Sequence, residues 1–314
     1  MSMKKCQIDV VIVGSCNMDL ISYVSRFPKP GETIHGKRFC TGFGGKGANQ
    51  CVMASRLGAK TAMVGKVGDD SYGRDTIMNF KENNVVTDFL NTTKESSTGV
   101  APILVDDSGQ NSIVIVSGAN FQITPVDVQQ ALSQMESPKV LVCQLEILQE
   151  TVLAALKEAR ALGITTILNP APGVPGLPDE FYQYSDFFCP NETETELLTG
   201  LSVSCVEEAK KASLVLLDKG CKTAIITMGG EGAVYATAEA RTPLHVPVDA
   251  VTPVDTTGAG DAFIGSLAFY LANHSSLELG EMIKRSCEIA STSVLSPGTQ
   301  TSFPWKQSLH PHLL

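Results

Sequence analysis

Two glycine-rich segments of the chain combine residue types that can bind an anion and move a proton. Residues 255–261 have the sequence DTTGAGD, residues 42–50 have the sequence GFGGKGANQ, and each runs into an apolar helical stretch. Small residues let a ligand approach the backbone, and the first N–H groups of a helix lack intrahelical acceptors, so they can bind phosphate. Asp261 stands where its carboxylate could accept a proton from a hydroxyl group beside that anion. Two such segments on opposite sides of one site could serve a sugar and a nucleotide.

Simpler interpretations of these glycines must be considered. A Gly-Ala-Gly run is an ordinary tight turn, and an Asp in a first helical turn complements the helix dipole. Gly42, Gly44 and Gly47 satisfy G-x-G-x-x-G, and Asp69 follows 22 residues after the last of them. That fingerprint joins a first strand directly to a helix, however, and here about thirty residues intervene after the strand expected at 8–14. A P-loop does not fit either, because Lys46 is followed by glycine rather than Ser or Thr.

The composition argues against a protein that binds nucleic acid or spans a membrane. The chain has 314 residues, of which 43% are hydrophobic and 18% charged, as in an ordinary globular protein. Its net charge of −9 and the lack of a Lys/Arg cluster disfavour a nucleic-acid partner. No apolar run approaches the roughly 20 residues that a membrane span needs. The nine cysteines are scattered without metal-ligand spacing, and the five histidines pair with no nucleophile, so we expect a reduced, cytoplasmic protein, with the nucleus also open.

The apolar pattern predicts an α/β fold. Short, continuously apolar runs, which indicate strands covered on both faces, alternate with helical patterns. The expected strands are 8–14, 61–67, 139–144, 164–168, 187–189 and 223–228, and the expected helices include 149–161, 191–198 and 206–219. This alternation predicts one domain, spanning 1–314, with a doubly wound, mostly parallel sheet flanked by helices.

Two segments interrupt this alternation. Residues of about 18–42 contain Pro28, Pro30 and Gly31 between extended pieces, and residues of about 97–120 have a hairpin pattern, with strands at 100–105 and 113–116 and a turn at 106–109. Both flank the glycines at 42–47. We expect a small separate β-sheet that forms a lid over the site, although simple decoration of the sheet edge is an alternative.

Three motifs give the chain a resemblance to a known family. GGKGANQ at 44–50, NETE at 191–194 and DTTGAGD at 255–261 resemble, in this order, the signatures of the ribokinase-like carbohydrate and nucleoside kinases. The resemblance extends from Gly14 and Ser15 to the segment 298–300, which covers nearly the whole chain. It implies phosphoryl transfer from ATP to the primary hydroxyl of ribose, giving ribose 5-phosphate.

The resemblance also implies roles for individual residues. Asp261 would be the general base, and the amides of Gly258, Ala259 and Gly260 would form an anion hole. The implied sugar-binding residues are Asn17, Met18, Asp19, Gly45, Lys46, Gly47, Ala48, Asn49, Glu146 and Asp261. The implied nucleotide-binding residues are Asn191, Thr227, Met228, Gly229, Gly230, Glu231, Gly232, Gly260 and Cys287. Cys287 departs from the His or Asn expected beside adenine, which affects the expected nucleotide affinity rather than the chemistry.

Two kinds of metal ion are implied by the same resemblance. Asn191 and Glu194, at positions i and i+3, resemble a pair that positions magnesium, with Glu194 binding the ion directly or through water. An N-cap Asn followed by acidic residues explains the same pattern without a metal. An activating potassium ion is implied at a set of oxygen-bearing positions: Asp255, Thr257, Ser293, Ser296, Gly298 and Ser302.

The expected partners are ribose and ATP, and the resemblance adds a homodimer formed through the β-lid. One alternative is a kinase of the same fold that acts on 2-deoxyribose, fructose or a nucleoside. Another, of a different class, is a sugar-binding regulator that has lost catalysis. A turnover assay separates the regulator from the kinases.

Overall fold

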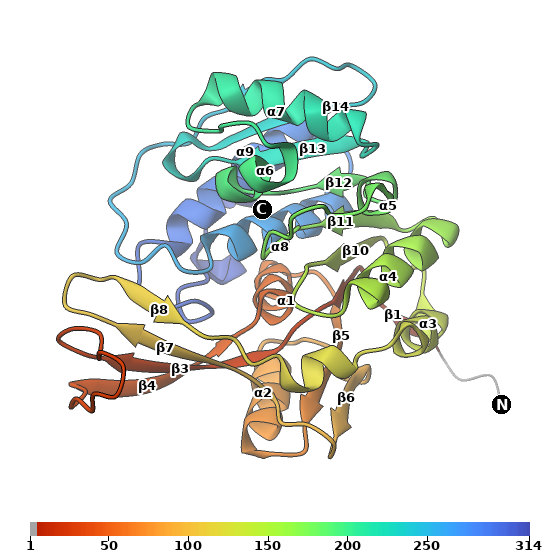
Figure 1. The fold of residues 1–314 in the computed structure, drawn as a ribbon. Coiled ribbons are helices and arrows are strands. Elements are labelled where there is room, and N and C mark those ends of the chain that lie inside the picture. The colour runs from red at the N-terminus through yellow and green to blue at the C-terminus, as the bar shows by residue number, and fades with distance from the viewer. Residues whose placement is uncertain (1–4) are drawn as a thin grey trace.

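The computed structural model describes residues 5–314 (Figure 1). Its central nine-stranded sheet has the strand order β15-β14-β13-β12-β11-β10-β2-β5-β6. Neighbouring strands from β13 to β6 are parallel, and β14 and β15 are antiparallel at one edge. These strands are β2 (Val10–Val13), β5 (Thr61–Gly68), β6 (Leu90–Thr93), β10 (Val140–Cys143), β11 (Thr165–Leu168), β12 (Phe187–Phe188), β13 (Thr223–Thr227), β14 (Ala233–Thr237) and β15 (Leu244–Val246). A separate parallel pair joins β1 (Cys6–Gln7) to β9 (Met135–Glu136).

Helices cover both faces of the central sheet. The helices are α1 (Lys46–Leu57), α2 (Ser71–Glu82), α3 (Pro125–Ser133), α4 (Gln149–Ala161), α5 (Asp179–Gln183), α6 (Glu192–Thr199), α7 (Val206–Asp218), α8 (Ala259–Asn273) and α9 (Leu279–Ser293). Short 3-10 turns occupy Gly118–Gln122, Gly229–Glu231, Lys306–Ser308 and Pro311–Leu313. One hydrophobic core packs α1, α2, α8 and α9 against the sheet, and a second packs α3 to α7 against its other face. The predicted doubly wound sheet is therefore confirmed.

Strand β2 shows why continuous apolarity is informative. All four of its residues are fully buried, with Val11 and Val13 in one core and Val10 and Ile12 in the other. A strand that is covered on both faces needs apolar side chains at every position rather than at every second one. The helix predicted at 149–161 has these bounds in the structure, as α4.

A second, four-stranded sheet projects from this body, as the red and yellow strands of Figure 1 show. It has the order β4-β3-β7-β8 and is formed by β3 (Asn17–Tyr23), β4 (Arg38–Gly44), β7 (Gly99–Val105) and β8 (Asn111–Ile113). The last strand begins at Asn111, two residues before the expected 113–116, and Val116 still pairs with Val100 in the same register. Within residues 5–314, no helix is long and apolar enough to cross a membrane.

Candidate active site

Helix α8 begins with the predicted anion-binding segment. Its N-cap is Gly258, whose φ of 82° lies in the left-handed region, and a Cβ there would lie 2.5 Å from Thr299 Cγ2. Only glycine meets both conditions without strain. Ala259 N–H donates to Thr256 O at 3.2 Å, whereas the Gly260 amide has no backbone acceptor within residues 5–314. Of the three amides expected to form an anion hole, Ala259 is thus engaged in a turn, whereas those of Gly258 and Gly260 donate to no backbone oxygen within residues 5–314 and are free to bind an anion.

Asp261, in the first turn of α8, has a buried carboxylate, and 7% of the residue is exposed. Its Oδ2 accepts a hydrogen bond from Asn49 Nδ2 and its Oδ1 accepts one from Gln50 Nε2, both at 2.9 Å. Both amides lie on α1, which approaches α8 closely at Gly265, where a Cβ would lie 2.6 Å from Gln50 O. The two glycine-rich segments therefore meet at Asp261.

The expected sugar-binding side chains come from three neighbouring segments. Glu146 follows β10, and its Oε2 accepts hydrogen bonds from Ser15 Oγ at 2.5 Å and from Lys46 N at 2.9 Å. Asn17 begins β3, and its Oδ1 accepts from Asn120 Nδ2 at 2.8 Å. Ser15 and Asn120, which fix these two groups, are not among the predicted site residues.

Glycines pack the backbone against these polar groups. A Cβ at Gly44 would lie 2.6 Å from the Asp19 carboxyl carbon, and one at Gly45 would lie 2.8 Å from Asn17 N. A Cβ at Gly47 would lie 2.6 Å from Ser15 N. The side chains of two other predicted sugar-binding residues, Met18 and Ala48, are buried. These two positions therefore contribute backbone and packing rather than an exposed side chain.

Burial and mutual repulsion set the charge state of this cluster. Burial, together with the nearby carboxylates of Glu146 and Asp261, raises the pKa of Asp19 to about 7. Burial alone would lower the pKa of Lys46, but attraction to Asp261, Glu146 and Glu194 outweighs it and raises that pKa. The site thus holds one firmly charged ammonium group among several carboxyl groups.

A cavity of about 530 Å³ lies beside the start of α8. Seven of the predicted nucleotide-binding residues line it: Asn191, Thr227, Gly229, Gly230, Gly232, Gly260 and Cys287. Met228 and Glu231 belong to the same turn but do not line the cavity, and Met228 is buried. No motif of the sequence indicates the rest of the wall, which includes residues 248–251, Phe263 and Val294.

Cys287 is one wall of this cavity and is 6% exposed. Burial raises the pKa of its thiol to about 12. At neutral pH the group is therefore a neutral, weakly polar surface for a ligand.

A smaller cavity of about 160 Å³ adjoins the first. Its lining includes Lys46, Glu194 and Asp261. Asn191, Thr227 and Gly260 line both cavities. A ligand in the larger cavity can therefore reach the Asp261 carboxylate past the free Gly260 amide.

Comparison with known proteins identifies the family of this chain. A family described as pfkB family carbohydrate kinase matches residues 7–306. The chain belongs to this carbohydrate kinase family. It is 52% identical to the ribokinase of Mus musculus, over 96% of this chain and 93% of the mouse protein. It is 40% identical to the deoxyribokinase of Salmonella typhi, over 98% and 99% of the two chains. The structure of Arabidopsis thaliana ribokinase complexed with ribose and ATP superposes with a TM-score of 0.89 at 29% identity, over 98% and 99% of the two chains.

In this carbohydrate kinase, Asn191 and Glu194 form a capping box at the start of α6. Asn191 Oδ1 accepts from Glu194 N at 2.8 Å, and Glu194 Oε2 accepts from Asn191 N at 3.0 Å. The cap interpretation of these residues is thus confirmed. Burial raises the pKa of Glu194, and its side chain also lines the smaller cavity. A carboxylate in this position has the chemistry to hold magnesium or one of its waters.

Five of the six predicted potassium residues lie on two adjacent loops, and Ser293 is the last residue of α9. Asp255 accepts hydrogen bonds from Thr257 N and Gly298 N, both at 2.9 Å, and these bonds outweigh burial and lower its pKa. The hydroxyls of Ser293 and Ser302 donate to the carbonyls of Ala290 and Thr299, and Ser296 is exposed. An ionised carboxylate among hydroxyl and carbonyl oxygens is a donor set that fits a monovalent cation.

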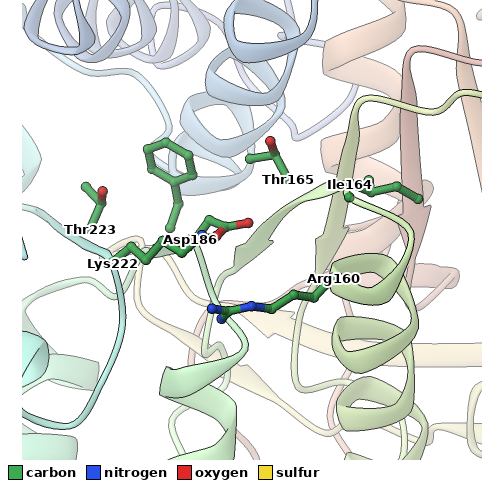
Figure 2. Close-up of a pocket in the computed structure, with 8 residues that line it drawn as sticks. Arg160, Ile164, Thr165, Asp186, Lys222 and Thr223 are labelled. Carbon is green, nitrogen blue, oxygen red and sulfur yellow. Dashed lines mark ion pairs between the residues drawn. The ribbon is translucent and has the colours of Figure 1, made fainter.

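The pocket in Figure 2 lies at the amino ends of three inner strands of the central sheet. Thr165, Phe187 and Thr223, the first residues of β11, β12 and β13, line this hollow of about 360 Å³. Its charged groups include Asp186, whose Oδ1 pairs with Lys222 Nζ at 2.5 Å. Glu146, Asn191 and Thr227 instead lie at or just after the carboxyl ends of the parallel strands β10, β12 and β13, where ligands bind in such sheets.

Proposed function

We propose that this protein transfers the γ-phosphoryl group of ATP to the primary hydroxyl of ribose, giving ribose 5-phosphate. The observation that carries the proposal is the junction of the two cavities at Gly260, with the Asp261 carboxylate in the wall of the smaller one. Identity to mouse ribokinase over nearly the whole chain supports ribose as the acceptor. Likeness to a plant ribokinase that binds ribose and ATP supports both substrates.

In the proposed reaction, Asp261 orients the ribose hydroxyl and accepts its proton as the oxygen attacks phosphorus. The O–H bond breaks, a new P–O bond forms, and ADP leaves with the electron pair of the broken P–O bond. The Gly258 and Gly260 amides, joined by that of Ala259 when its bond to Thr256 O opens, stabilise the charge on the transferring group. Lys46 lines the cavity that holds Asp261 and adds a positive charge.

Ribose hydroxyls would be held by carboxylate and amide groups around that cavity. Asn17, Asp19, Asn49 and Glu146 offer acceptors and donors that match hydroxyl groups in pairs. Gly45 and Gly47 let the sugar approach the backbone, and the adjoining peptide groups of Met18 and Ala48 complete this wall. The nucleotide would occupy the larger cavity, between the turn from Thr227 to Gly232 and Cys287.

We propose two metal ions as cofactors. Glu194 would hold Mg²⁺, directly or through water, and the bound ion would neutralise charge on the ATP phosphates. A potassium ion would bind among Asp255, Thr257, Ser293, Ser296, Gly298 and Ser302. The ionised Asp255 carboxylate and its contact with the Gly298 amide support this location because they fix the two loops together.

We propose that the four-stranded sheet is a lid over the ribose site and also the surface of a homodimer. Asn17, Asp19 and Gly44 are part of its strands β3 and β4, which ties the sheet to the site. Apolar side chains on this sheet are half or more exposed, among them Phe39 (61%), Ile113 (50%) and the adjoining Val114 (61%). Sedimentation that finds only monomer at micromolar concentration would refute the dimer, and Val114→Lys should weaken it.

We also propose a cytoplasmic or nuclear location. All nine cysteines are free thiols, and Cys205 is exposed, which suits a reducing compartment. Imaging of a fluorescent fusion tests this.

The decisive experiment measures ADP release with ATP and magnesium across ribose, 2-deoxyribose, fructose and adenosine, with and without potassium. Turnover that is selective for ribose, increases with potassium and is lost in Asp261→Ala would establish the function. Ribose binding without turnover on any acceptor would leave a sugar-binding regulator.

A second candidate is phosphorylation of 2-deoxyribose. The 40% identity to the deoxyribokinase of Salmonella typhi, over nearly the full length of both proteins, favours it as a side activity or as the main one. The ratio of kcat/KM for the two sugars in the same assay decides between them.

A further inference from the structure

The Asp261 carboxylate ends a chain of buried and half-buried amide side chains, whose connection no motif of the sequence reveals. Asn49 donates to one carboxylate oxygen, and the Oδ1 of Asn49 accepts from Gln300 Nε2 at 2.9 Å. Gln300 Oε1 in turn accepts from Asn79 Nδ2 at 2.8 Å. Asn79 Oδ1 accepts from Asn83 Nδ2 at 3.2 Å. We call the series Asp261, Asn49, Gln300, Asn79 and Asn83 the amide chain.

The far end of the amide chain is a cation. Arg56 Nε donates to Asn83 Oδ1 at 2.7 Å, and Arg56 Nη1 donates to the backbone oxygens of Gln300 and Phe303 at 2.6 and 2.7 Å. Burial lowers the pKa of Arg56 to about 10, so the group keeps its charge at neutral pH.

The two ends fix the direction of every hydrogen bond between them. An ionised carboxylate only accepts and a guanidinium only donates. Asn49 must therefore present its nitrogen to Asp261 and its oxygen to Gln300, and the same choice propagates to Asn79 and Asn83. A series of aligned amides polarises itself, which strengthens the last donor at the carboxylate.

A second branch reaches the other carboxylate oxygen. Gln50 Nε2 donates to Asp261 Oδ1, and Gln50 Oε1 accepts from Gln144 Nε2 at 2.6 Å. Gln50 and Gln144 are each 1% exposed. A Cβ at Gly14 would clash with Gln144 Oε1, so this glycine makes room for the second branch. Each oxygen of Asp261 thus has one fixed amide donor and retains a lone pair for a substrate hydroxyl.

We propose that Gln300 is a positioning residue of the kinase reaction, which holds Asp261 through Asn49 with its carboxylate plane and donor direction fixed. The proposal rests on the proposed function of Asp261 as the base. Gln300 is 4% exposed and does not touch Asp261 itself. Its side chain connects the loop after α9 to helices α1 and α2, so it joins three segments that are far apart in the sequence.

The test compares Gln300→Met with Gln300→Glu. Met keeps the volume and removes both hydrogen bonds, so kcat should fall about tenfold while KM for ATP is unchanged. Glu also keeps the size but presents only acceptors to Asn49 Oδ1, which turns the Asn49 amide so that its oxygen faces Asp261. The loss in kcat should then be larger than for Met, on the order of a hundredfold.

A more distant variant and a matched control complete the experiment. Asn79→Leu, one amide further along, should lower kcat by less than Gln300→Met and move the acid limb of the kcat/KM profile to higher pH. Thr76→Val, on the same helix α2, removes a buried hydroxyl without a hydrogen-bond partner in residues 5–314 and should leave kcat unchanged.

The outcomes separate this proposal from the proposed function. Wild-type protein without turnover, or an active Asp261→Ala, would refute the assigned reaction or base. Loss of activity in Asp261→Ala, with unchanged kcat and pH profile in Gln300→Met and Asn79→Leu, would overturn the amide chain alone. Equal losses for Gln300→Met and Gln300→Glu, with a lower melting temperature in both, would reduce Gln300 to a packing residue. If the Gln300 variants do not fold, the pH profile of Asn79→Leu decides.

Discussion

Replacing Asp19 by Asn should stabilise the fold while it damages sugar binding. Asp19 has a pKa of about 7 in the folded protein, against an ordinary value of 3.8, because it is buried beside Glu146 and Asp261. The native state therefore holds a proton that the unfolded chain releases, and unfolding becomes easier as pH rises from 3.8 through 7. Above that window the ionised carboxylate costs the fold roughly 4 kcal/mol. Asn is close in size to Asp but cannot ionise, so the substitution removes this cost.

The pH dependence isolates the effect of ionisation. Between about pH 5 and about pH 8, the stability of the wild type relative to Asp19→Asn should fall by about 3 kcal/mol, since roughly two pH units of that window lie below 7. Urea unfolding of both proteins at the two pH values measures this difference. Using the difference between the two proteins cancels the titration of all other groups, provided that Glu146 and Asp261 respond alike in both.

The opposite result would contradict the electrostatic argument. If Asp19→Asn gains the same stability at both pH values, the gain comes from packing or hydrogen bonds rather than from removal of a charge. If Asp19→Asn is less stable at about pH 8, the wild-type carboxylate is compensated by a partner that the geometry does not include. Calorimetric titration with ribose should show affinity falling about tenfold from about pH 8 to about pH 6 in the wild type and a flat profile in Asp19→Asn.

Three further predictions address other parts of the site. Asp261→Asn should lower kcat by about 10²- to 10⁴-fold with little change in the melting temperature. Steady-state ADP release and thermal unfolding measure these two quantities. Wild-type turnover in this variant would exclude Asp261 as the general base. Gly258→Ala should lower activity and should also lower the free energy of unfolding. The left-handed backbone alone costs about 1–2 kcal/mol of that stability, and the contact with Thr299 adds to the loss. An unchanged midpoint of urea unfolding would contradict this. Iodoacetamide at neutral pH should label the exposed Cys205 and spare Cys287, whose pKa is about 12. Peptide mass spectrometry of the labelled protein measures this, and labelling of Cys287 in preference to Cys205 would contradict it.

The sequence predicts the fold well where one local signal decides. Strands β2, β5, β10, β11 and β13 can be found because they are buried on both faces and are therefore continuously apolar. Strand β8 begins two residues before the predicted 113–116, because Asn111 and Ser112, which continue the pairing toward the turn, are polar and exposed and so carry no apolar signal. Its pairing is set by the turn after β7, which hydrophobicity does not encode.

The site residues are likewise predicted where a local motif marks them and missed where their role depends on distant residues. The glycine-rich segments lead to Asp261 and Asn49, which the structure joins by a hydrogen bond. Gln300 and Asn120 are not predicted as site residues, because an isolated amide side chain does not form a recognisable sequence motif. Their importance depends on residues roughly a hundred or more positions away: Gln300 bonds Asn49, and Asn120 bonds Asn17.

The charges of the site explain why the proposed reaction needs help from backbone and metal ions. Within residues 5–314, Lys46 is the only cationic side chain that lines either cavity, while Glu192, Glu194, Asp249 and Asp261 line them with carboxyl groups. A nucleotide brings more negative charge into this surrounding, so binding cannot rest on side-chain cations. The free amides at the start of α8 supply partial positive charge, and a magnesium ion beside Glu194 would supply the rest. Nucleotide affinity should therefore be largely lost when magnesium is chelated. Lys46→Met should weaken nucleotide binding by much less than chelation does. A larger effect of Lys46→Met would show that this side chain, and not the metal ion, neutralises the charge of the phosphates.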